Sequence, residues 1–230
     1  MSWKENARKL ASKEVLKHIK DGFIIGLGSG TTMEIFIKEL AYKIKFEELD
    51  VLAVPSSTQV ELIAASLGIK LTSLNEYPKL DLAIDGADQV EVKTLNLIKG
   101  GGAALTREKI IDSSAKKLVI IIDEEKLTDK LSCPIPLEVM QFGIKATIEK
   151  IIEIGGKPKL RESLGKVGPV VTDNGNFIID VDFGELNKPE ELNYKLKMIP
   201  GVIETGLFLR MTNEVYVGEK NGKVKVLTKS

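Results

Sequence analysis

Residues 23–32 read Phe-Ile-Ile-Gly-Leu-Gly-Ser-Gly-Thr-Thr, and this stretch decides the fold class. Phe23–Leu27 is a short apolar run, which indicates a strand buried on both faces. The glycine-rich turn Gly26–Thr32 follows, and apolar residues between Met33 and Ile44 then recur on one helical face. A buried strand, a glycine turn and a helix in succession indicate one unit of a parallel sheet.

The same succession of strand and helix recurs along the first 130 residues or so. The pattern predicts further strands at 51–54, 80–84 and 118–122, and helices at 4–20, 58–67 and about 103–117. Strands that alternate with helices need crossover connections, so we expect a mainly parallel sheet. The predicted fold class is α/β, with a Rossmann-like sheet flanked by helices.

A different pattern begins near residue 131. Ser132–Pro136 contains two prolines, which do not suit a central strand because they lack an N–H donor. This stretch therefore predicts a domain boundary. Beyond it the sequence predicts a helix at 144–154, a hairpin at 170–181, a helix at 189–198 and a strand at 202–208. This order is typical of a smaller α+β, ferredoxin-like domain. We expect residues 1–131 and about 207–230 to form the Rossmann-like domain and residues 132–206 the ferredoxin-like one.

The composition excludes several classes of protein. The 230 residues carry 33 basic and 33 acidic side chains, and this balance argues against a nucleic-acid partner or a polybasic membrane surface. With one histidine and one cysteine, His18 and Cys133, no intrachain disulfide can form, and any Ser-His-Asp triad or histidine-ligated zinc would need His18. The apolar runs are too short to span a bilayer and no signal peptide is recognisable, so we expect a cytoplasmic protein without membrane segments.

Ligands of open parallel sheets bind outside the carboxyl ends of the strands. Four stretches follow predicted strands in this way: Gly28–Thr32, Ser56–Ser57, Asp85–Asp88 and Asp123–Lys126. For any single loop, glycine and small polar residues are more typical of an ordinary turn or a helix cap. Four such loops at one edge of a sheet favour a ligand pocket.

The first loop does not match the nucleotide-binding motifs. Thr31 stands where the dinucleotide fingerprint needs a glycine, and no lysine follows Gly30 as a P-loop requires. What remains is a turn of backbone amides with the hydroxyls of Ser29, Thr31 and Thr32 at a helix N-terminus. Such a turn suits a phosphate monoester, although Ser29 or Thr31 could instead only cap the helix.

Two later motifs carry charge beside glycine. Asp85-Gly-Ala-Asp88 places two carboxylates in one turn, where they suit sugar hydroxyls or acid–base chemistry, with an Asx-turn as the structural alternative. No neighbouring residues complete a recognisable metal site around them. Lys99-Gly-Gly-Gly102 lets the backbone approach a ligand beside a fixed positive charge. Glu108 lies on the following predicted helix, where a glutamate taken alone is usually a solvated surface residue.

Together and in this order, these motifs resemble the ribose 5-phosphate isomerase A family. The resemblance rests on six stretches that cover most of the chain: Gly26–Thr32, Asp85–Asp88, Lys99–Lys109, Asp123–Lys126, Val171–Asn176 and Pro200–Phe208. Two residues depart from the family pattern, since Gln89 stands where glutamate is common and Ser29 where threonine is common.

The resemblance implies an aldose–ketose isomerase that interconverts ribose 5-phosphate and ribulose 5-phosphate in the pentose phosphate pathway, without cofactor or metal. Glu108 matches the general base that moves a proton between C2 and C1 through an enediolate. Asp85, Asp88 and Lys99 are the other implied catalytic residues. The implied substrate contacts are Ser29, Gly30, Thr31, Thr32, Asp85, Gly86, Ala87, Asp88, Lys99, Gly100, Gly101, Gly102 and Lys126.

The implied partner is a small sugar phosphate, and the family forms homodimers or homotetramers. Two other functions stay open at this point. A related aminosugar-phosphate isomerase or deaminase would generally need a histidine, and His18 lies on the predicted first helix, away from the motif loops. A non-catalytic sugar-phosphate sensor would usually carry a DNA-binding segment, for which this neutral chain has no spare residues.

Overall fold

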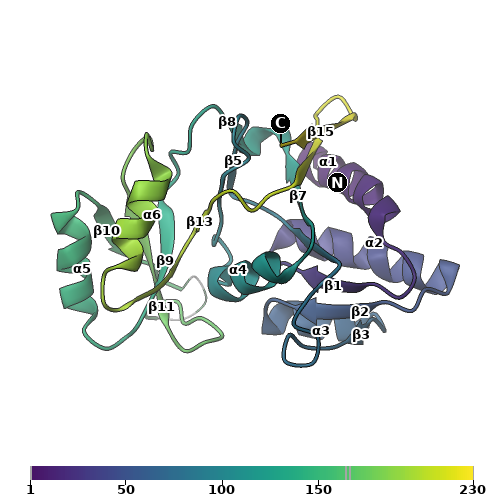
Figure 1. The fold of residues 1–230 in the computed structure, drawn as a ribbon, viewed down its shortest axis with the longest axis horizontal. Helices are drawn as coiled ribbons and strands as arrows, with labels where there is room; N and C mark the ends of the chain where they lie inside the picture. Colours follow the sequence, from purple (N-terminus) through teal and green to yellow (C-terminus); the bar gives the residue numbers. More distant parts are fainter. Residues whose placement is uncertain (1, 164, 166, 230) are drawn as a thin grey trace. The chain divides into compact units, whose positions relative to one another are not determined.

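The computed structural model describes residues 2–163, 165 and 167–229 (Figure 1). The chain divides into two compact units. Unit 1 consists of residues 1–87, 107–127 and 210–230, and unit 2 of residues 88–106 and 128–209. The domain limits expected near residues 131 and 207 stay a prediction.

Unit 1 contains a mainly parallel sheet with helices on both faces. Its strands have the order β15-β14-β7-β4-β1-β2-β3, and only the pairing of β14 with the edge strand β15 is antiparallel among the described residues. The elements are α1 (Trp3–Val15), β1 (Ile24–Leu27), α2 (Thr31–Glu47), β2 (Leu52–Pro55), α3 (Thr58–Ser66), β3 (Lys70–Leu71), β4 (Leu82–Asp85), α4 (Leu105–Ser114), β7 (Leu118–Asp123), β14 (Glu214–Gly218) and β15 (Val224–Thr228). The predicted α/β fold with a mainly parallel sheet is confirmed.

Alternation along β1 explains how both faces of this sheet are covered. Ile25 and Leu27 are fully buried in the apolar cluster that also contains residues of α1, α2 and α3. Gly26 faces the other way, and a Cβ atom at this position would lie 2.3 Å from Cγ2 of Ile111 on α4. Gly26 therefore allows α4 to pack closely against the sheet, because any side chain there would displace the helix.

Unit 2 contains the ferredoxin-like arrangement. Its elements are β5 (Gln89–Glu91), β6 (Leu97–Ile98), β8 (Leu127–Thr128), β9 (Ile135–Val139), α5 (Ile144–Glu153), β10 (Lys157–Leu160), β11 (Phe177–Asp182), α6 (Pro189–Lys197), β12 (Val202–Thr205) and β13 (Leu207–Phe208). The chain order β9-α5-β10-β11-α6-β12 and the antiparallel sheet order β10-β11-β9-β12 are those of a split βαβ fold, as predicted. A second small sheet has the order β13-β6-β5-β8.

The expectation that the prolines of Ser132–Pro136 do not suit a central strand is wrong for Pro136. Pro136 lies in β9, which pairs with β11 on one side and with β12 on the other. The carbonyl of Pro136 accepts a hydrogen bond of 2.6 Å from the N–H of Gly206, just beyond the end of β12. In an antiparallel ladder, the backbone N and O atoms of one residue point toward the same neighbouring strand. The nitrogen of Pro136 therefore points toward Gly206, beyond the last residue pair of β9 and β12, where the ladder needs no N–H donor.

The predicted hairpin at 170–181 is also wrong in its first arm. β11 already pairs with β9 and β10, and the first arm contributes only the isolated bridge between Val171 and Phe177. The turn itself forms, because Oε1 of the fully buried Glu138 accepts hydrogen bonds from the side chains of Thr172, Asn174 and Asn176, at 2.9, 3.0 and 2.8 Å. A buried carboxylate thus holds the turn where a ladder was expected.

The strand predicted at 202–208 is interrupted at Gly206. This residue bonds to Pro136 through its N–H and accepts a 2.9 Å hydrogen bond from the N–H of Lys99. The chain therefore passes from one sheet of unit 2 to the other, with β12 before Gly206 and β13 after it. Sequence patterning does not predict β3, β6 and β8, because strands of two residues carry no periodicity.

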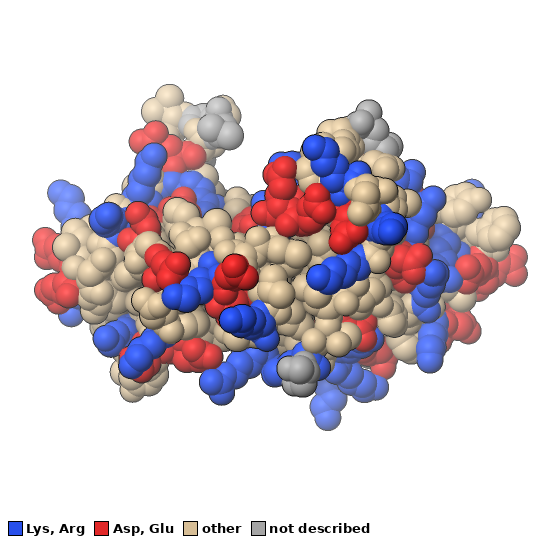
Figure 2. Space-filling view, turned by 90° about the horizontal axis from the view of Figure 1, so that it is seen from above, with Lys and Arg blue, Asp and Glu red and all other residues tan. Residues whose placement is uncertain are grey.

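Charges of both signs are mixed over the face drawn in Figure 2, in agreement with the equal numbers of basic and acidic residues. Among the helices of the described residues, none has the length and apolar character that a bilayer crossing requires.

Candidate active site

The carboxyl ends of β1, β4 and β7 meet at one edge of the unit 1 sheet, because these strands are parallel neighbours. The glycine turn follows β1, Asp85 ends β4, and Asp123 ends β7 with a short 3-10 helix at Glu124–Lys126 after it. The N–H of Gly28 donates to the carbonyl of Ile84 at 2.9 Å, so the glycine turn is joined to β4 directly. The fourth loop, Ser56–Ser57, follows β2, the parallel neighbour of β1. All four loops expected to carry chemistry therefore lie where open α/β sheets bind ligands.

The fourth stretch, Ser56–Ser57, begins a helix. The Ser57 hydroxyl accepts a 3.2 Å hydrogen bond from the N–H of Val60 and caps α3. For Ser57, the alternative that such a loop residue only caps a helix is confirmed.

Gly28 lies directly against the carboxylate of Asp85. A Cβ atom on Gly28 would lie 1.9 Å from both Cγ and Oδ1 of Asp85, which leaves no room for any side chain. Asp85 is fully buried, and its Oδ1 accepts a 2.6 Å hydrogen bond from the N–H of Gly86. The carboxylate is thus held in a fixed position between two glycines.

Ser29, the next residue of the turn, donates its hydroxyl hydrogen bond to Oε1 of Glu108. Glu108 lies in the first turn of α4 and is only 4% exposed, so it is not the solvated surface glutamate that its position on a helix would suggest. Because Gly28 contacts Asp85 and Ser29 contacts Glu108, two consecutive residues of the turn connect the two carboxylates.

The N-terminus of α2 supports the interpretation of the turn as an anion site. The N-cap of this helix is Gly30, at φ 89°, and it makes no side-chain cap hydrogen bond among the residues described. The alternative that Ser29 or Thr31 serves as this cap is therefore wrong. A Cβ atom on Gly86 would lie in van der Waals contact with Thr32, at 3.6 Å from its Cβ, so the turn after β4 approaches this helix end.

Arg8 contacts two of the predicted loops and was not predicted from the sequence. Its Nε and Nη2 atoms donate to Oδ2 of Asp123 at 2.8 and 2.7 Å, and its Nη1 donates to Oγ1 of Thr31 at 3.1 Å. Asp123 is 1% exposed. Arg8 therefore connects the turn after β1 with the turn after β7, which ends at Lys126. Its contacts span 23 and 115 residues of sequence, and no local motif marks them.

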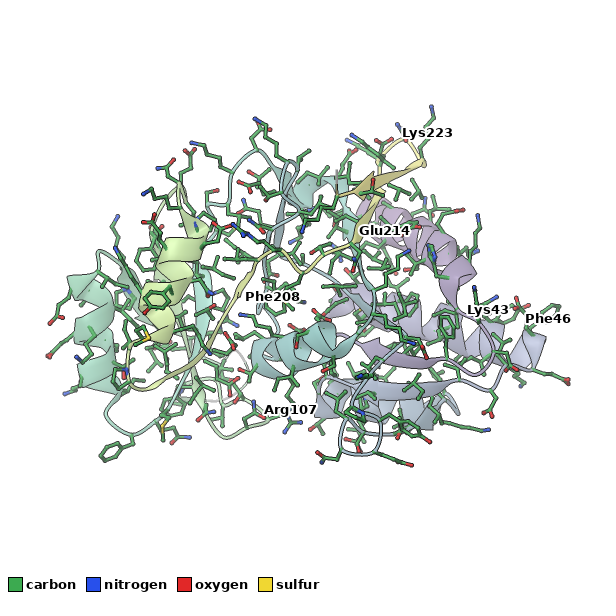
Figure 3. The ribbon with its side chains drawn as sticks, in the orientation of Figure 1. Lys43, Phe46, Arg107, Phe208, Glu214 and Lys223 are labelled. Carbon is green, nitrogen blue, oxygen red and sulfur yellow. The ribbon has the colours of Figure 1, made fainter. Side chains whose placement is uncertain are left out.

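Unit 2 holds the remaining predicted residues. Oδ2 of Asp88 accepts a 2.8 Å hydrogen bond from the N–H of Gly101. Lys99 is 3% exposed, and its ammonium lies 5.3 Å from the ring centroid of the fully buried Phe208, which Figure 3 labels on β13. A buried cation beside an aromatic face and a glycine loop can stabilise negative charge on a ligand.

The predicted residues thus divide between the units. Unit 1 contains Ser29, Gly30, Thr31, Thr32, Asp85, Gly86, Ala87, Glu108 and Lys126, and unit 2 contains Asp88, Lys99, Gly100, Gly101 and Gly102. Within unit 1 the structure brings together the turn at 28–32, Asp85, Gly86 and Glu108. Gln89, which departs from the family pattern, accepts hydrogen bonds from the N–H groups of Ser132 and Cys133 at 2.7 and 3.0 Å.

His18 lies at the opposite edge of the unit 1 sheet. Its Nε2 atom is 2.6 Å from the hydroxyl of Tyr216 and 3.6 Å from Glu214, the first residue of β14. Burial, together with the positive charge of Lys117, lowers the pKa of His18, and burial beside Glu214 raises the pKa of Tyr216 to about 12. Because β14 is parallel to β7, its start lies away from the carboxyl-end loops. The only histidine of the chain is therefore not part of the candidate site.

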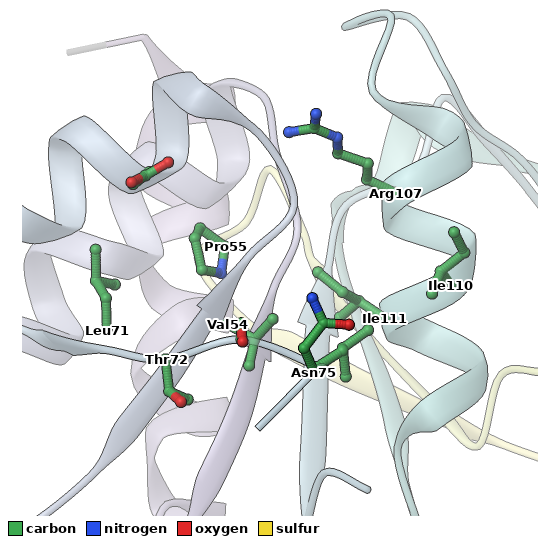
Figure 4. A pocket seen from close by; sticks show the side chains of 11 residues that line it. Val54, Pro55, Leu71, Thr72, Asn75, Arg107, Ile110 and Ile111 are labelled. Carbon is green, nitrogen blue, oxygen red and sulfur yellow. The ribbon is translucent and has the colours of Figure 1, made fainter. Parts of the chain in front are cut away.

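Unit 1 also contains a pocket of about 570 Å³ (Figure 4). Val54, Pro55 and Leu71 line one side of it and Ile110 and Ile111 of α4 the other. None of the predicted catalytic or substrate-contacting residues lines this pocket. Within the described ranges, no group of three or more His, Cys, Asp or Glu side chains is arranged to hold a metal ion.

A family model described as ribose 5-phosphate isomerase A (phosphoriboisomerase A) matches residues 52–222. The chain belongs to the ribose 5-phosphate isomerase A family. It is 50% identical over 221 residues to ribose-5-phosphate isomerase A of Methanococcus aeolicus, covering 95% of this chain and 93% of the relative.

Solved structures of the family agree with this assignment. The structure of ribose 5-phosphate isomerase A from Methanocaldococcus jannaschii is 44% identical, with a TM-score of 0.94 and coverage of 98% of this chain and 99% of that one. A D-ribose-5-phosphate isomerase in complex with phospho-erythronic acid is 44% identical, with a TM-score of 0.95 over 100% of both chains.

Proposed function

We propose that the chain interconverts D-ribose 5-phosphate and D-ribulose 5-phosphate, as an aldose–ketose isomerase of the pentose phosphate pathway. The observation that carries this proposal is the buried Glu108 carboxylate, held by the glycine turn, in a chain that aligns over almost its whole length with ribose 5-phosphate isomerase A relatives. A relative that binds phospho-erythronic acid supports a phosphorylated sugar as the substrate, because the planar carboxylate of this acid resembles an enediolate.

The reaction needs a base and a way to stabilise charge on oxygen. Glu108 takes the proton from C2 of the open-chain aldose, the electron pair of the C–H bond forms the C1–C2 double bond, and the π pair of the C1 carbonyl moves onto O1 to give an enediolate. The protonated Glu108 then returns this proton to C1, while the hydroxyl proton on O2 is transferred to O1. The net change is the conversion of an aldehyde at C1 into a ketone at C2, without gain or loss of atoms or electrons.

Asp85, Asp88 and Lys99 are the other proposed catalytic residues. The Lys99 ammonium is buried beside Phe208, where a positive charge stabilises the developing enediolate oxygen more strongly than it does in water. Asp85 and Asp88 are proposed to orient the sugar hydroxyls and to assist proton transfer between O1 and O2. Gly86, Ala87, Gly100, Gly101 and Gly102 are proposed to contact the sugar, with the N–H of Gly101 held by Asp88.

The phosphate is assigned to the turn before α2. Ser29, Gly30, Thr31 and Thr32 place amides and hydroxyls at the start of a helix, where the helix dipole favours an anion. Lys126, at the end of the neighbouring turn after β7, is proposed to add a positive charge. We further propose that the enzyme needs no cofactor or metal, functions in the cytoplasm and assembles as a homodimer or homotetramer.

The decisive experiment is an assay of the purified protein with ribose 5-phosphate in the presence of EDTA. Ribulose 5-phosphate should form at a rate that EDTA does not change. Absence of product contradicts the proposed function, and an activity that returns only with added metal contradicts the metal-free mechanism. Binding without turnover would favour a sensor, and release of ammonia from an aminosugar phosphate would favour a deaminase.

A variant at Glu108 then tests the assignment of the base. Glu108→Gln keeps an acceptor for the Ser29 hydroxyl and should lower kcat by about 10²- to 10⁴-fold while binding of phospho-erythronic acid, measured by calorimetry, is retained. The matched control is Glu47→Gln, at the exposed end of α2, which should behave as the parent protein. Loss of binding together with turnover would mean that Glu108 is structural.

A further inference from the structure

Arg161, the residue that follows β10, makes two sets of contacts within unit 2. Its Nε donates to Oδ2 of Asp180 at 2.8 Å, and its Nη2 donates to Oδ1 of the same carboxylate. Its Nη1 donates to the carbonyl oxygens of Gly100 and Gly101, at 2.8 and 3.1 Å. The bidentate pair with Asp180 fixes the plane of the guanidinium, and this plane directs the remaining nitrogen at the glycine loop.

These contacts hold the peptide group between Gly100 and Gly101 from both sides. Its carbonyl oxygen accepts the bond from Arg161, and its N–H donates to Oδ2 of Asp88 at 2.8 Å. A trans peptide directs its C=O and N–H in opposite directions, so Arg161 and Asp88 lie on opposite sides of the loop. By the same geometry, the bond from Arg161 to the carbonyl of Gly101 turns the N–H of Gly102 away from Arg161.

Arg161 adds an external constraint to the loop's own turn hydrogen bond, which the N–H of Ala103 donates to the carbonyl of Gly100 at 3.0 Å. Three consecutive glycines have more backbone freedom than any other tripeptide, and fixing each residue costs about 1–2 kcal/mol of conformational free energy. Gly100 adopts φ 108°, and a Cβ atom there would lie 2.8 Å from Leu105, so a stiffer residue cannot replace it. Gly101 and Gly102 are exposed, so burial does little to order them.

We propose that Arg161 is a positioning residue of the isomerase, which holds the Lys99–Gly102 loop with the N–H of Gly101 on Asp88 and the N–H of Gly102 directed at the sugar. The proposal rests on the proposed function, in which this loop contacts the substrate. Arg161 acts through the loop and does not touch the reacting atoms. Lysine cannot replace it, because a single ammonium cannot hold Asp180 with two parallel bonds and also reach two carbonyl oxygens.

The test compares Arg161→Met, Arg161→Ala and Asp180→Asn with the control Lys130→Met. Lys130 forms an exposed ion pair with Glu185 in the same unit, at 2.6 Å, and has no contact with the glycine loop. Arg161→Met should lower kcat for ribose 5-phosphate by about 100-fold, the effect of a small misplacement of contacting groups, with a much smaller change in KM. Asp180→Asn should show a weaker loss of the same kind, and Lys130→Met should match the parent protein.

Two further readouts separate positioning from a structural role. Added guanidinium should restore part of kcat to Arg161→Ala, whose cavity can admit it, but not to Arg161→Met, whose side chain occupies the space. Hydrogen exchange at the amides of Gly101 and Gly102 should accelerate in Arg161→Met and not in Lys130→Met. If Arg161→Met does not fold, Asp180→Asn and Arg161→Lys provide the same comparison.

The possible outcomes are distinct. Variants of Arg161 that lose thermal stability but keep the parent kcat and KM would overturn the proposal, and so would unchanged exchange at Gly101. If the parent protein does not isomerise ribose 5-phosphate, the proposed function fails, and the exchange measurement still decides whether Arg161 orders the loop.

Discussion

The hydroxyl of Ser29 donates a hydrogen bond to Oε1 of Glu108, which joins the glycine turn after β1 to the carboxylate proposed as the base. Glu108 is 4% exposed, so this bond orients a buried carboxylate. The turn therefore has two functions in the proposed site. It provides amides for an anion, and it fixes the direction in which Glu108 faces.

The first prediction concerns this hydrogen bond. Ser29→Ala should lower kcat by about 10- to 100-fold, because a hydrogen bond to a charged group contributes about 1.5–3 kcal/mol. Ser29→Thr keeps a hydroxyl donor and should stay close to the parent enzyme. Steady-state kinetics with ribose 5-phosphate measures both variants. Equal loss in the two variants would contradict the role of the hydroxyl and indicate a steric effect.

The second prediction concerns Gly28. Gly28→Ala should destabilise the protein by about 1–3 kcal/mol and abolish most of the activity, because its Cβ would lie 1.9 Å from the Asp85 carboxylate. Urea unfolding and the isomerase assay measure the two effects. Gly22→Ala is the control, since Gly22 has φ 75° but nothing within 4 Å of an added Cβ. The control should lose some stability through its backbone strain and keep its activity.

The third prediction concerns Arg8. Arg8→Met should raise KM for ribose 5-phosphate and lower the free energy of unfolding by about 1.5–3 kcal/mol, because the buried Asp123 loses its charged donors. The double variant Arg8→Met with Asp123→Asn removes the uncompensated charge and should recover stability but not KM. Recovery of both would show that Arg8 affects catalysis only through stability.

The fourth prediction concerns pH. Burial, with the charges of Lys117 and Lys20, lowers the pKa of His18, while Glu214 opposes this shift. A lowered pKa means that the unfolded chain binds the proton more readily, so stability should decrease as pH falls below the ordinary histidine value and level off below the lowered one. Urea unfolding between about pH 5 and 8 should show this decrease, and His18→Gln should lack that component. An identical pH dependence in the variant would contradict it.

The local sequence pattern was sufficient to predict the helices and strands that are long or strongly apolar. The strand at β1, the glycine turn and α2 follow from residues 23–47, because burial on both faces and helical periodicity are properties of consecutive residues. It failed at Pro136 and at residues 170–172, where the outcome depends on which edges of β9 and β11 are already occupied. Such occupancy is a property of the whole sheet.

The sequence by itself determined the parallel α/β order, the family resemblance and the identity of the chemical groups, because these depend on residue type and short spacing. Only the tertiary structure decided that Glu108 is buried against Ser29, that Asp85 lies against Gly28, and that Arg8 and Arg161 hold loops far from them in sequence. These relations depend on the close approach of segments separated by 23 to 115 residues. No local propensity encodes that approach, because it follows from the packing of complete sheets and helices.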